Sequence, residues 1–216
     1  MQHIQEKVGP QKKFYEKFTR IFNIIFAGLV LLLTSPVFIL VSLIIKITSR
    51  GPVFYKQKRL GRDGKIIEIY KFRTMVKDAD KILEELLKKN PNLKVEFDKY
   101  FKLKNDPRIT PIGKILRKTS LDELPQFINV LKGEMNVVGP RPLTPREIDF
   151  FGEFKEKILS VNPGLTGLAQ VSGRSNLSHA ERALLDVDYI DNRSVWLDLL
   201  IILKTFKVIF TGHGAY

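Results

Sequence analysis

The chain has 216 residues, enough for one domain with a core or for one domain plus an anchor. It contains no cysteine, which excludes disulfides, thiolate zinc sites and a cysteine nucleophile, and its three separated histidines form no zinc-binding spacing. The 36 lysines and arginines against 23 acidic residues give a net charge of +13, which favours a polyanionic partner: nucleic acid, an anionic membrane surface or a phosphorylated substrate.

The first predicted element is an uncharged apolar segment, residues 21–45. A straight helix of that length is about 38 Å long at ~1.5 Å per residue, and the hydrocarbon core of a bilayer is about 30 Å thick. Ser35 and Pro36 interrupt the segment, and a proline bends a helix because it lacks a backbone donor. Both flanks are basic, and basic flanks stay in the cytoplasm. A bent span and a re-entrant helix both fit, and the flanks favour the re-entrant helix.

The remaining elements follow from apolar periodicity and turn residues. They are a β-hairpin over 52–75 around "GRDG", a helix over 77–89 that stops at Pro91, a short helix over 111–118, a longer helix over 122–132, a glycine-rich loop with a short strand over 162–174, and a helix over 178–190. The apolar stretch 195–210 is too short to span a bilayer comfortably. It fits an interfacial helix with Trp196 at the headgroups, and it fits a buried core helix equally well. The fold class is therefore α+β.

The stretch "TSLDELPQ" carries two adjacent carboxylates, Asp122 and Glu123. One reading is helix punctuation: Ser120 and Glu123 fit a capping box, and Asp122 is an alternative N-cap. The other reading is a catalytic site, because basic residues with phosphate-binding chemistry occur nearby in the sequence and in the hairpin. These are Arg59, Lys71, Arg73, Arg117 and Arg141, the last fixed between two prolines. Carboxylates among such residues predict a phosphate substrate with a hard cation such as Mg²⁺.

Four motifs carry a resemblance to a known family. "KFRTM", "NDPRITPIGKILRKTSLDELPQFINVLKGEMNVVGPRPL", "PGLTGLAQVSGR" and the final "GAY" resemble the bacterial sugar transferase family, the monotopic polyprenol-phosphate phosphoglycosyl transferases. The resemblance runs from about residue 15 to the C-terminus. Larger members carry further membrane helices and a domain before this core, so we expect this chain to be close to the minimal catalytic unit.

The resemblance implies a reaction and a set of roles. A sugar 1-phosphate passes from a UDP-sugar to undecaprenyl phosphate, and UMP leaves. Asp122 is then the nucleophile that forms a covalent phosphosugar intermediate, Glu123 helps to hold Mg²⁺, and Arg117 and Arg141 bind phosphate. Asp186 resembles a further acidic position of the family.

The resemblance also implies an architecture. Residues 1–50 are expected to form an N-terminal segment with a re-entrant membrane helix, broken at Ser35 and Pro36. Residues 51–216 are expected to form a small membrane-associated catalytic domain with a C-terminal interfacial helix. The domain is then on the cytoplasmic face of the bacterial inner membrane, in contact with its lipids, and no nucleic-acid partner is expected.

Two rival interpretations remain open from the sequence. The first is membrane-associated phosphodiester chemistry in which Asp122 or Glu123 is only a metal ligand and no covalent intermediate forms. The second is a membrane-anchored basic scaffold that binds polyanions in general without catalysis, with salt-sensitive binding to phosphates. Release of UMP from a UDP-sugar distinguishes the proposed enzyme from the scaffold.

Overall fold

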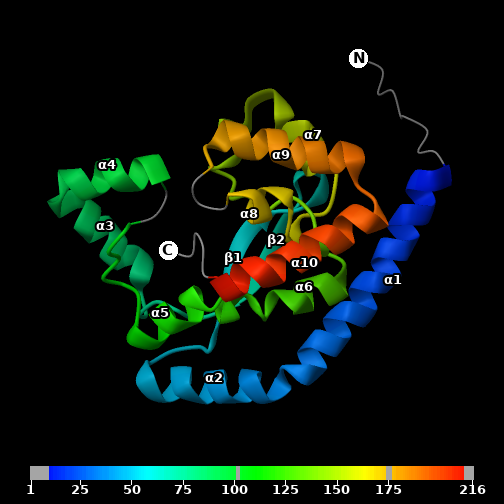
Figure 1. Ribbon diagram of the computed structural model, residues 1–216. Helices are drawn as coiled ribbons and strands as arrows, with labels where there is room; N and C mark the ends of the chain where they lie inside the picture. The colour runs from blue at the N-terminus through cyan, green and yellow to red at the C-terminus, as the bar shows by residue number, and fades with distance from the viewer. Residues whose placement is uncertain (1–9, 101–102, 174–176, 212–216) are drawn as a thin grey trace.

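The computed structural model describes residues 10–100, 103–173 and 177–211, and the "GAY" motif lies outside them. Two long helices, α1 (Pro10–Leu33) and α2 (Ser35–Thr48), follow one another with a bend of 59° between their axes. In Figure 1 they form an L, and the rest of the chain lies in its inner corner. No single helix of the described residues is long and apolar enough to cross a membrane, although α1 and α2 taken together have the length and composition required.

The bend occurs where Ser35 and Pro36 interrupt the apolar segment, which confirms the predicted break. Pro36 has no N–H to donate to the carbonyl of Leu32, four residues earlier. The Ser35 hydroxyl donates to that carbonyl at 2.8 Å, and the Thr34 hydroxyl donates to the carbonyl of Val30 at 2.6 Å. The Ser35 hydroxyl thus replaces the donor that Pro36 lacks, and the Thr34 hydroxyl adds a second bond to the Val30 carbonyl, which also accepts from the Thr34 N–H.

The predicted hairpin is confirmed. Strands β1 (Phe54–Leu60) and β2 (Ile66–Phe72) pair antiparallel, with Phe54 opposite Phe72 and Leu60 opposite Ile66. The "GRDG" turn forms a short 3₁₀ segment, η1 (Arg62–Gly64), in which Asp63 takes a left-handed conformation with φ of 58°. Aspartate tolerates that conformation better than most residues do.

The predicted helix over 77–89 is confirmed as α3 (Ala79–Lys89). Pro91, predicted only to end the helix over 77–89, also starts a second helix, α4 (Pro91–Tyr100). Proline is well tolerated in the first turn of a helix, where the N–H has no intrahelical partner. Helices α3 and α4 form an arm that projects from the body of the molecule (Figure 1).

The helix predicted over 122–132 is wrong in its first turn. After α5 (Pro111–Lys118), the chain forms a 3₁₀ turn, η2 (Leu121–Glu123), and the α-helix α6 spans only Gln126–Lys132. Pro125 cannot donate to the carbonyl of Leu121, so that carbonyl accepts instead from the N–H of Leu124 at 3.2 Å, a 3₁₀ bond.

Neither predicted cap forms at this turn. Ser120 has a left-handed backbone with φ of 57°, and its side chain makes no capping hydrogen bond. The N-cap of α6 is Pro125 rather than Asp122. The two carboxylates are therefore not helix punctuation in this structure.

The glycine-rich stretch contains the predicted strand, β4 (Gly164–Thr166), and an unpredicted helix, α8 (Leu168–Ser172). Strand β4 pairs in parallel with β3 (Asn136–Val138), which was also not predicted. Their backbones approach so closely that a Cβ at Gly164 would lie 2.1 Å from the nitrogen of Gly139. Two further unpredicted segments are η3 (Ile148–Phe154) and α7 (Lys155–Leu159).

The last two predicted helices are confirmed as α9 (His179–Asn192) and α10 (Val195–Thr211). Helix α9 begins with a capping box between Ser178 and Glu181. Helix α10 buries Ile201 and Ile202 in the main core and leaves Trp196, two-thirds exposed, and Phe206 on the outside. The structure confirms a core role for the inner face, and the interfacial role of the exposed face stays a prediction.

Two apolar clusters hold the helices and strands together. The larger joins Ala27 of α1 to β2, α6, the parallel strand pair, α9 and α10. The smaller joins Val41 and Ile45 of α2 to Phe72 and Leu116. The N-terminal helices thus pack directly against the parts of the chain that carry Lys71 and Asp122. The mixture of helices and strands confirms the α+β prediction.

Candidate active site

Asp122 and Glu123 lie on the η2 turn between α5 and α6. The left-handed Ser120 reverses the chain just before them. Asp122 is buried, whereas the Glu123 side chain is one-third exposed. The base of α5 is held by the Thr110 cap, whose hydroxyl accepts from the N–H of Gly113 at 3.0 Å. The turn thus presents one sheltered and one accessible carboxylate.

Lys71 of β2 connects the hairpin to this turn. Its Nζ donates to Oε1 of Glu123 at 2.7 Å. Burial alone would raise the pKa of Glu123, but the positive charges of Lys71 and Arg141, with a smaller contribution from Arg59, lower it to about 2. Glu123 is therefore ionised throughout the physiological range.

Asp122 has the opposite shift. Burial raises the pKa of its carboxyl to about 6, and the negative charge of Glu123 adds to that rise. The positive charges of Lys71 and Arg117 oppose it without cancelling it. Two adjacent carboxyls with pKa values pushed apart are typical of a pair with separate chemical roles.

Arg117 lies at the end of α5, where its Nε donates to the hydroxyl of Thr74 at 3.0 Å. Thr74 belongs to the "KFRTM" motif, so this bond joins that motif to the segment before the carboxylates. Burial lowers the pKa of Arg117, and the charge of Asp122 opposes that shift. The structure thus brings Arg117 into the electrostatic neighbourhood of Asp122, as the sequence analysis expected.

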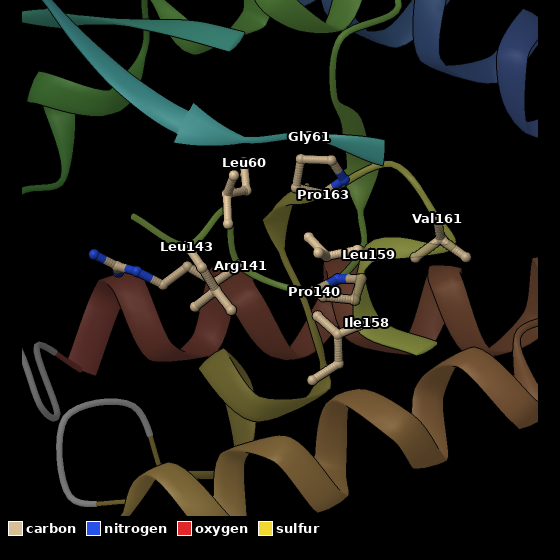
Figure 2. A pocket seen from close by; sticks show the side chains of 9 residues that line it. All are labelled: Leu60, Gly61, Pro140, Arg141, Leu143, Ile158, Leu159, Val161 and Pro163. Atoms are coloured by element: carbon tan, nitrogen blue, oxygen red, sulfur yellow. The ribbon is translucent and has the colours of Figure 1, made fainter. Parts of the chain in front are cut away.

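Arg141 is exposed and follows β3. Its backbone borders a small apolar cavity formed with β1, α7 and the segment before β4, but its side chain points away from the cavity (Figure 2). That cavity holds about 10 Å³, room for a single water molecule at most. Within the described part of the chain no hydrogen bond or ion pair engages the Arg141 guanidinium, although its charge acts on Glu123. Its donors are thus available to a ligand.

Arg59 and Glu147 form a second charged group next to the first. Arg59 is buried, and its Nη1 donates to Oε2 of Glu147 at 2.9 Å and to the carbonyl of Pro142 at 3.1 Å. Burial, together with the neighbouring charge of Arg141, lowers the pKa of Arg59 to about 10. Sequence reasoning missed Glu147, which is distant from Arg59 along the chain.

Arg73 is placed differently from the other candidates. Its Nη2 donates to the carbonyl and the hydroxyl of Ser49, at 2.8 and 2.7 Å, directly after α2. Burial lowers its pKa, and no charge of the Asp122–Glu123 pair contributes. In this structure Arg73 ties the hairpin to the N-terminal helices instead of facing the carboxylates.

Asp186 lies on the inner face of α9 and is 1% exposed. Neither of its carboxylate oxygens has a hydrogen-bond partner among the described residues, and burial raises its pKa to about 7. Arg182, one turn earlier, approaches to 4.0 Å. The charge of Arg141 acts on both Asp186 and Arg182. Arg182 was missed, although its i, i+4 spacing from Asp186 was visible in the sequence.

The donor chemistry at the pair fits a hard cation. Glu123 is ionised, and of its two oxygens only Oε1 has a hydrogen-bond partner in the described part of the chain. Mg²⁺ in phosphate enzymes typically takes one or two carboxylates and completes its shell with substrate phosphates and water. Nowhere in residues 10–100, 103–173 and 177–211 do three His, Cys, Asp or Glu side chains gather in a metal-binding group. A metal at Glu123 would therefore rely on substrate oxygens.

Several known proteins resemble this chain over most of its length. The profile of the bacterial sugar transferase family matches residues 14–212. The exopolysaccharide production protein ExoY of Rhizobium meliloti is 41% identical over 99% of this chain and 94% of its own length. The undecaprenyl-phosphate galactose phosphotransferase of Salmonella typhimurium is 44% identical over 91% of this chain. The UDP-glucose:undecaprenyl-phosphate glucose-1-phosphate transferase of Escherichia coli is 39% identical over 90%.

The relatives differ in length. This chain spans 41% of the Salmonella protein and 40% of the Escherichia protein, but nearly all of ExoY. The matched region includes Lys71, Arg117, Asp122, Glu123 and Arg141. Because the family profile matches almost the whole length of this chain, the chain belongs to the bacterial sugar transferase family.

Proposed function

We propose that this protein transfers a sugar 1-phosphate from a UDP-sugar to undecaprenyl phosphate with release of UMP, at the start of polysaccharide assembly. The names of the Salmonella and Escherichia relatives give this reaction for those proteins. The observation that carries the proposal here is the Asp122–Glu123 pair, whose pKa values of about 6 and about 2 differ in the presence of Lys71, Arg117 and Arg141. Both carboxylates are ionised above pH 6, as a nucleophile and a metal ligand require.

Asp122 is the nucleophile in this proposal. Its carboxylate oxygen attacks the phosphorus that bears the sugar, the bond from that phosphorus to the bridging oxygen breaks, and the electron pair leaves with UMP. An oxygen of undecaprenyl phosphate then attacks the same phosphorus and releases Asp122. The acceptor is already an anion, so the reaction needs no strong base. Phosphoryl transfer depends mainly on positioning and charge neutralisation.

The nearby cations bind the phosphates and stabilise their charge in this proposal. Lys71 and Arg117 act on Asp122 and stabilise the charge that builds on the attacked phosphoryl group. Arg141 has an uncommitted guanidinium fork suited to two oxygens of one phosphate. Mg²⁺ bound through Glu123 would supply charge neutralisation on the diphosphate.

The membrane association is also proposed. The outer faces of α1 and α2 expose Leu32, Leu33, Ile39 and Ile47 by 64 to 83%, while Ala27 and Ile45 on the inner faces are fully buried. We infer that the bent pair enters and leaves one leaflet of the bacterial inner membrane, with both ends and the catalytic domain on the cytoplasmic side. This places the active site beside a lipid-linked acceptor.

The test is a direct assay. Purified protein is incubated with undecaprenyl phosphate, Mg²⁺ and each member of a panel that begins with UDP-galactose and UDP-glucose. We expect one UMP released for each lipid-linked sugar phosphate formed with at least one donor. Phosphate binding that is general and salt-sensitive, without UMP release from any donor, would instead support the non-catalytic scaffold.

A further inference from the structure

A surface depression of about 390 Å³ lies at the edge of the hairpin, beside the candidate active site. Its size falls in the range of small-molecule sites, unlike the cavity in Figure 2. Three segments form its wall: β1, helix α4 of the projecting arm, and the loop before η3. The lining residues are Gln57, Lys58, Arg59, Phe97, Thr144, Pro145, Arg146 and Glu147.

Arg59 connects this depression to the carboxylate pair. Arg59 lines the depression, and its strand β1 pairs with β2, whose Lys71 donates to Oε1 of Glu123. Arg59 Nη1 donates to the carbonyl of Pro142, the residue after Arg141, and to Oε2 of Glu147, a partly buried residue that also lines the depression. The hairpin and the segment around Arg141 thus connect the carboxylate pair to the rim of the depression.

The lining chemistry suits a nucleoside monophosphate. Phe97 offers an aromatic ring, and every nucleobase has a flat face that stacks on such a ring. Gln57 uses its side-chain oxygen to accept from Arg59 at 3.0 Å, which leaves its amide N–H groups to donate to a carbonyl such as those of uracil. Lys58 and Arg146 are two exposed cations that line the depression, suited to phosphate oxygens.

We propose that the depression binds the uridine half of the donor, with the base against Phe97. This inference rests on the proposed function, in which Asp122 attacks the sugar-bearing phosphorus. The UMP portion must then extend away from Asp122, and the line through Arg141 and Arg59 leads it into the depression. Helix α4, which contributes nothing to the carboxylate pair, thereby becomes a determinant of nucleotide recognition.

The first test compares Phe97→Ala with two controls. Loss of a stacked ring weakens binding of the base, so we expect the KM for the UDP-sugar to rise about tenfold, with a small change in kcat and no change in the KM for undecaprenyl phosphate. Phe97→Tyr keeps an aromatic ring and should keep the KM. Val95→Ala alters the same helix at a residue that is 69% exposed and does not line the depression, so it should match the unaltered protein.

The second test isolates the base and does not depend on turnover. Calorimetry measures binding of UMP and of ribose 5-phosphate, which has the phosphate and sugar but no base, to the unaltered protein and to Phe97→Ala. We expect UMP to bind about tenfold more weakly to the variant and ribose 5-phosphate to bind within twofold. Equal losses for both ligands, or UMP binding unchanged within twofold, would overturn the assignment. If Phe97 governs UMP binding but no UDP-sugar is turned over, the proposed function fails and the nucleotide site stands.

Discussion

Lys71 Nζ donates a 2.7 Å hydrogen bond to Oε1 of Glu123, and the same ammonium lowers the pKa of neighbouring Asp122 against the effect of burial. One cation from β2 thus serves two carboxylates on the η2 turn. The result is a pair in which Glu123 loses its proton at a pH of about 2 and Asp122 at about 6. At neutral pH both are ionised, and only Asp122 titrates in the range where enzymes are assayed.

A pH profile tests this separation. If Asp122 must be ionised to attack phosphorus, kcat/KM for the UDP-sugar rises as pH increases through about 6 and levels off above pH 7. Lys71→Met removes a charge that lowers the pKa of Asp122, so it should move this rise to higher pH as well as reduce the rate. A profile that is flat from pH 5 to 8, or a rise that stays in place in Lys71→Met, would argue against this ionisation scheme.

Ionisation of Asp122 should lower the free energy of unfolding, although it raises activity. The folded-state pKa of about 6 lies above the ordinary value of 3.8, so the protonated form favours folding. That contribution is complete below pH 3.8 and is lost as pH rises through about 6. Asp122→Asn cannot ionise, so at pH 8 we expect it to exceed the unaltered protein in unfolding free energy by roughly 1–3 kcal/mol.

The measurement is the difference in Tm between Asp122→Asn and the unaltered protein in detergent at pH 5 and pH 8. The advantage of the variant should be larger at pH 8. A variant less stable at pH 8 would show that the Asp122 carboxylate stabilises the fold, as a capping residue does, and would weaken the catalytic interpretation.

Removal of the metal should abolish activity, and removal of the Glu123 carboxylate, its expected ligand, should strongly reduce it. Glu123→Gln keeps the size of the side chain but removes the charge that a hard cation needs, so we expect kcat to fall by about 100-fold or more. EDTA should abolish UMP release by the unaltered protein, and added Mg²⁺ should restore it. Glu68→Gln is the matched control, because Glu68 lies on the same strand as Lys71 and its carboxylate forms an exposed pair with Lys56. Full activity of the EDTA-treated protein would exclude the metal role of Glu123.

The topology of the α1–α2 pair can be tested with single cysteines, because the chain has none of its own. Lys17 and Lys65 are exposed and lie on opposite sides of the bend at Ser35 and Pro36. A re-entrant pair keeps both positions in the cytoplasm, so Lys17→Cys and Lys65→Cys should react with an impermeant thiol reagent only after the cells are permeabilised. Labelling of Lys17→Cys in intact cells would show that the pair spans the bilayer.

Local signals explain what the sequence predicted well. The "GRDG" turn between apolar strands, the periodicity of α3 and α9, and the Ser35-Pro36 break each depend on residues close together in the chain, and the structure confirms all of them. The first turn before α6 failed because a single missing N–H, that of Pro125, converts a helical turn into a 3₁₀ turn. Strand β3 was missed because its three residues are too few for an alternating pattern, whereas the glycine-rich stretch around β4 marked that strand.

The site was predictable as a set of residues but not as an arrangement. The adjacent carboxylates and the resemblance to a family pointed to Asp122 and Glu123, yet only the fold shows that Lys71 pairs with Glu123 while Arg73 turns to Ser49. These two cations are two residues apart on the hairpin, where composition alone cannot separate them. The pairing of Arg59 with Glu147 spans 88 residues and leaves no local trace in the sequence.

The most direct test of the central claim is mass spectrometry of the peptide that contains Asp122, after incubation of the protein with a UDP-sugar and Mg²⁺ in the absence of lipid acceptor. Covalent catalysis lets UMP leave before the acceptor binds, so the account predicts a sugar-phosphate mass on that peptide. The adduct should be absent in Asp122→Asn and lost when undecaprenyl phosphate is added. If UMP release strictly requires the lipid and no adduct can be trapped, or if Asp122→Asn turns over at a near-normal rate, Asp122 is not the nucleophile.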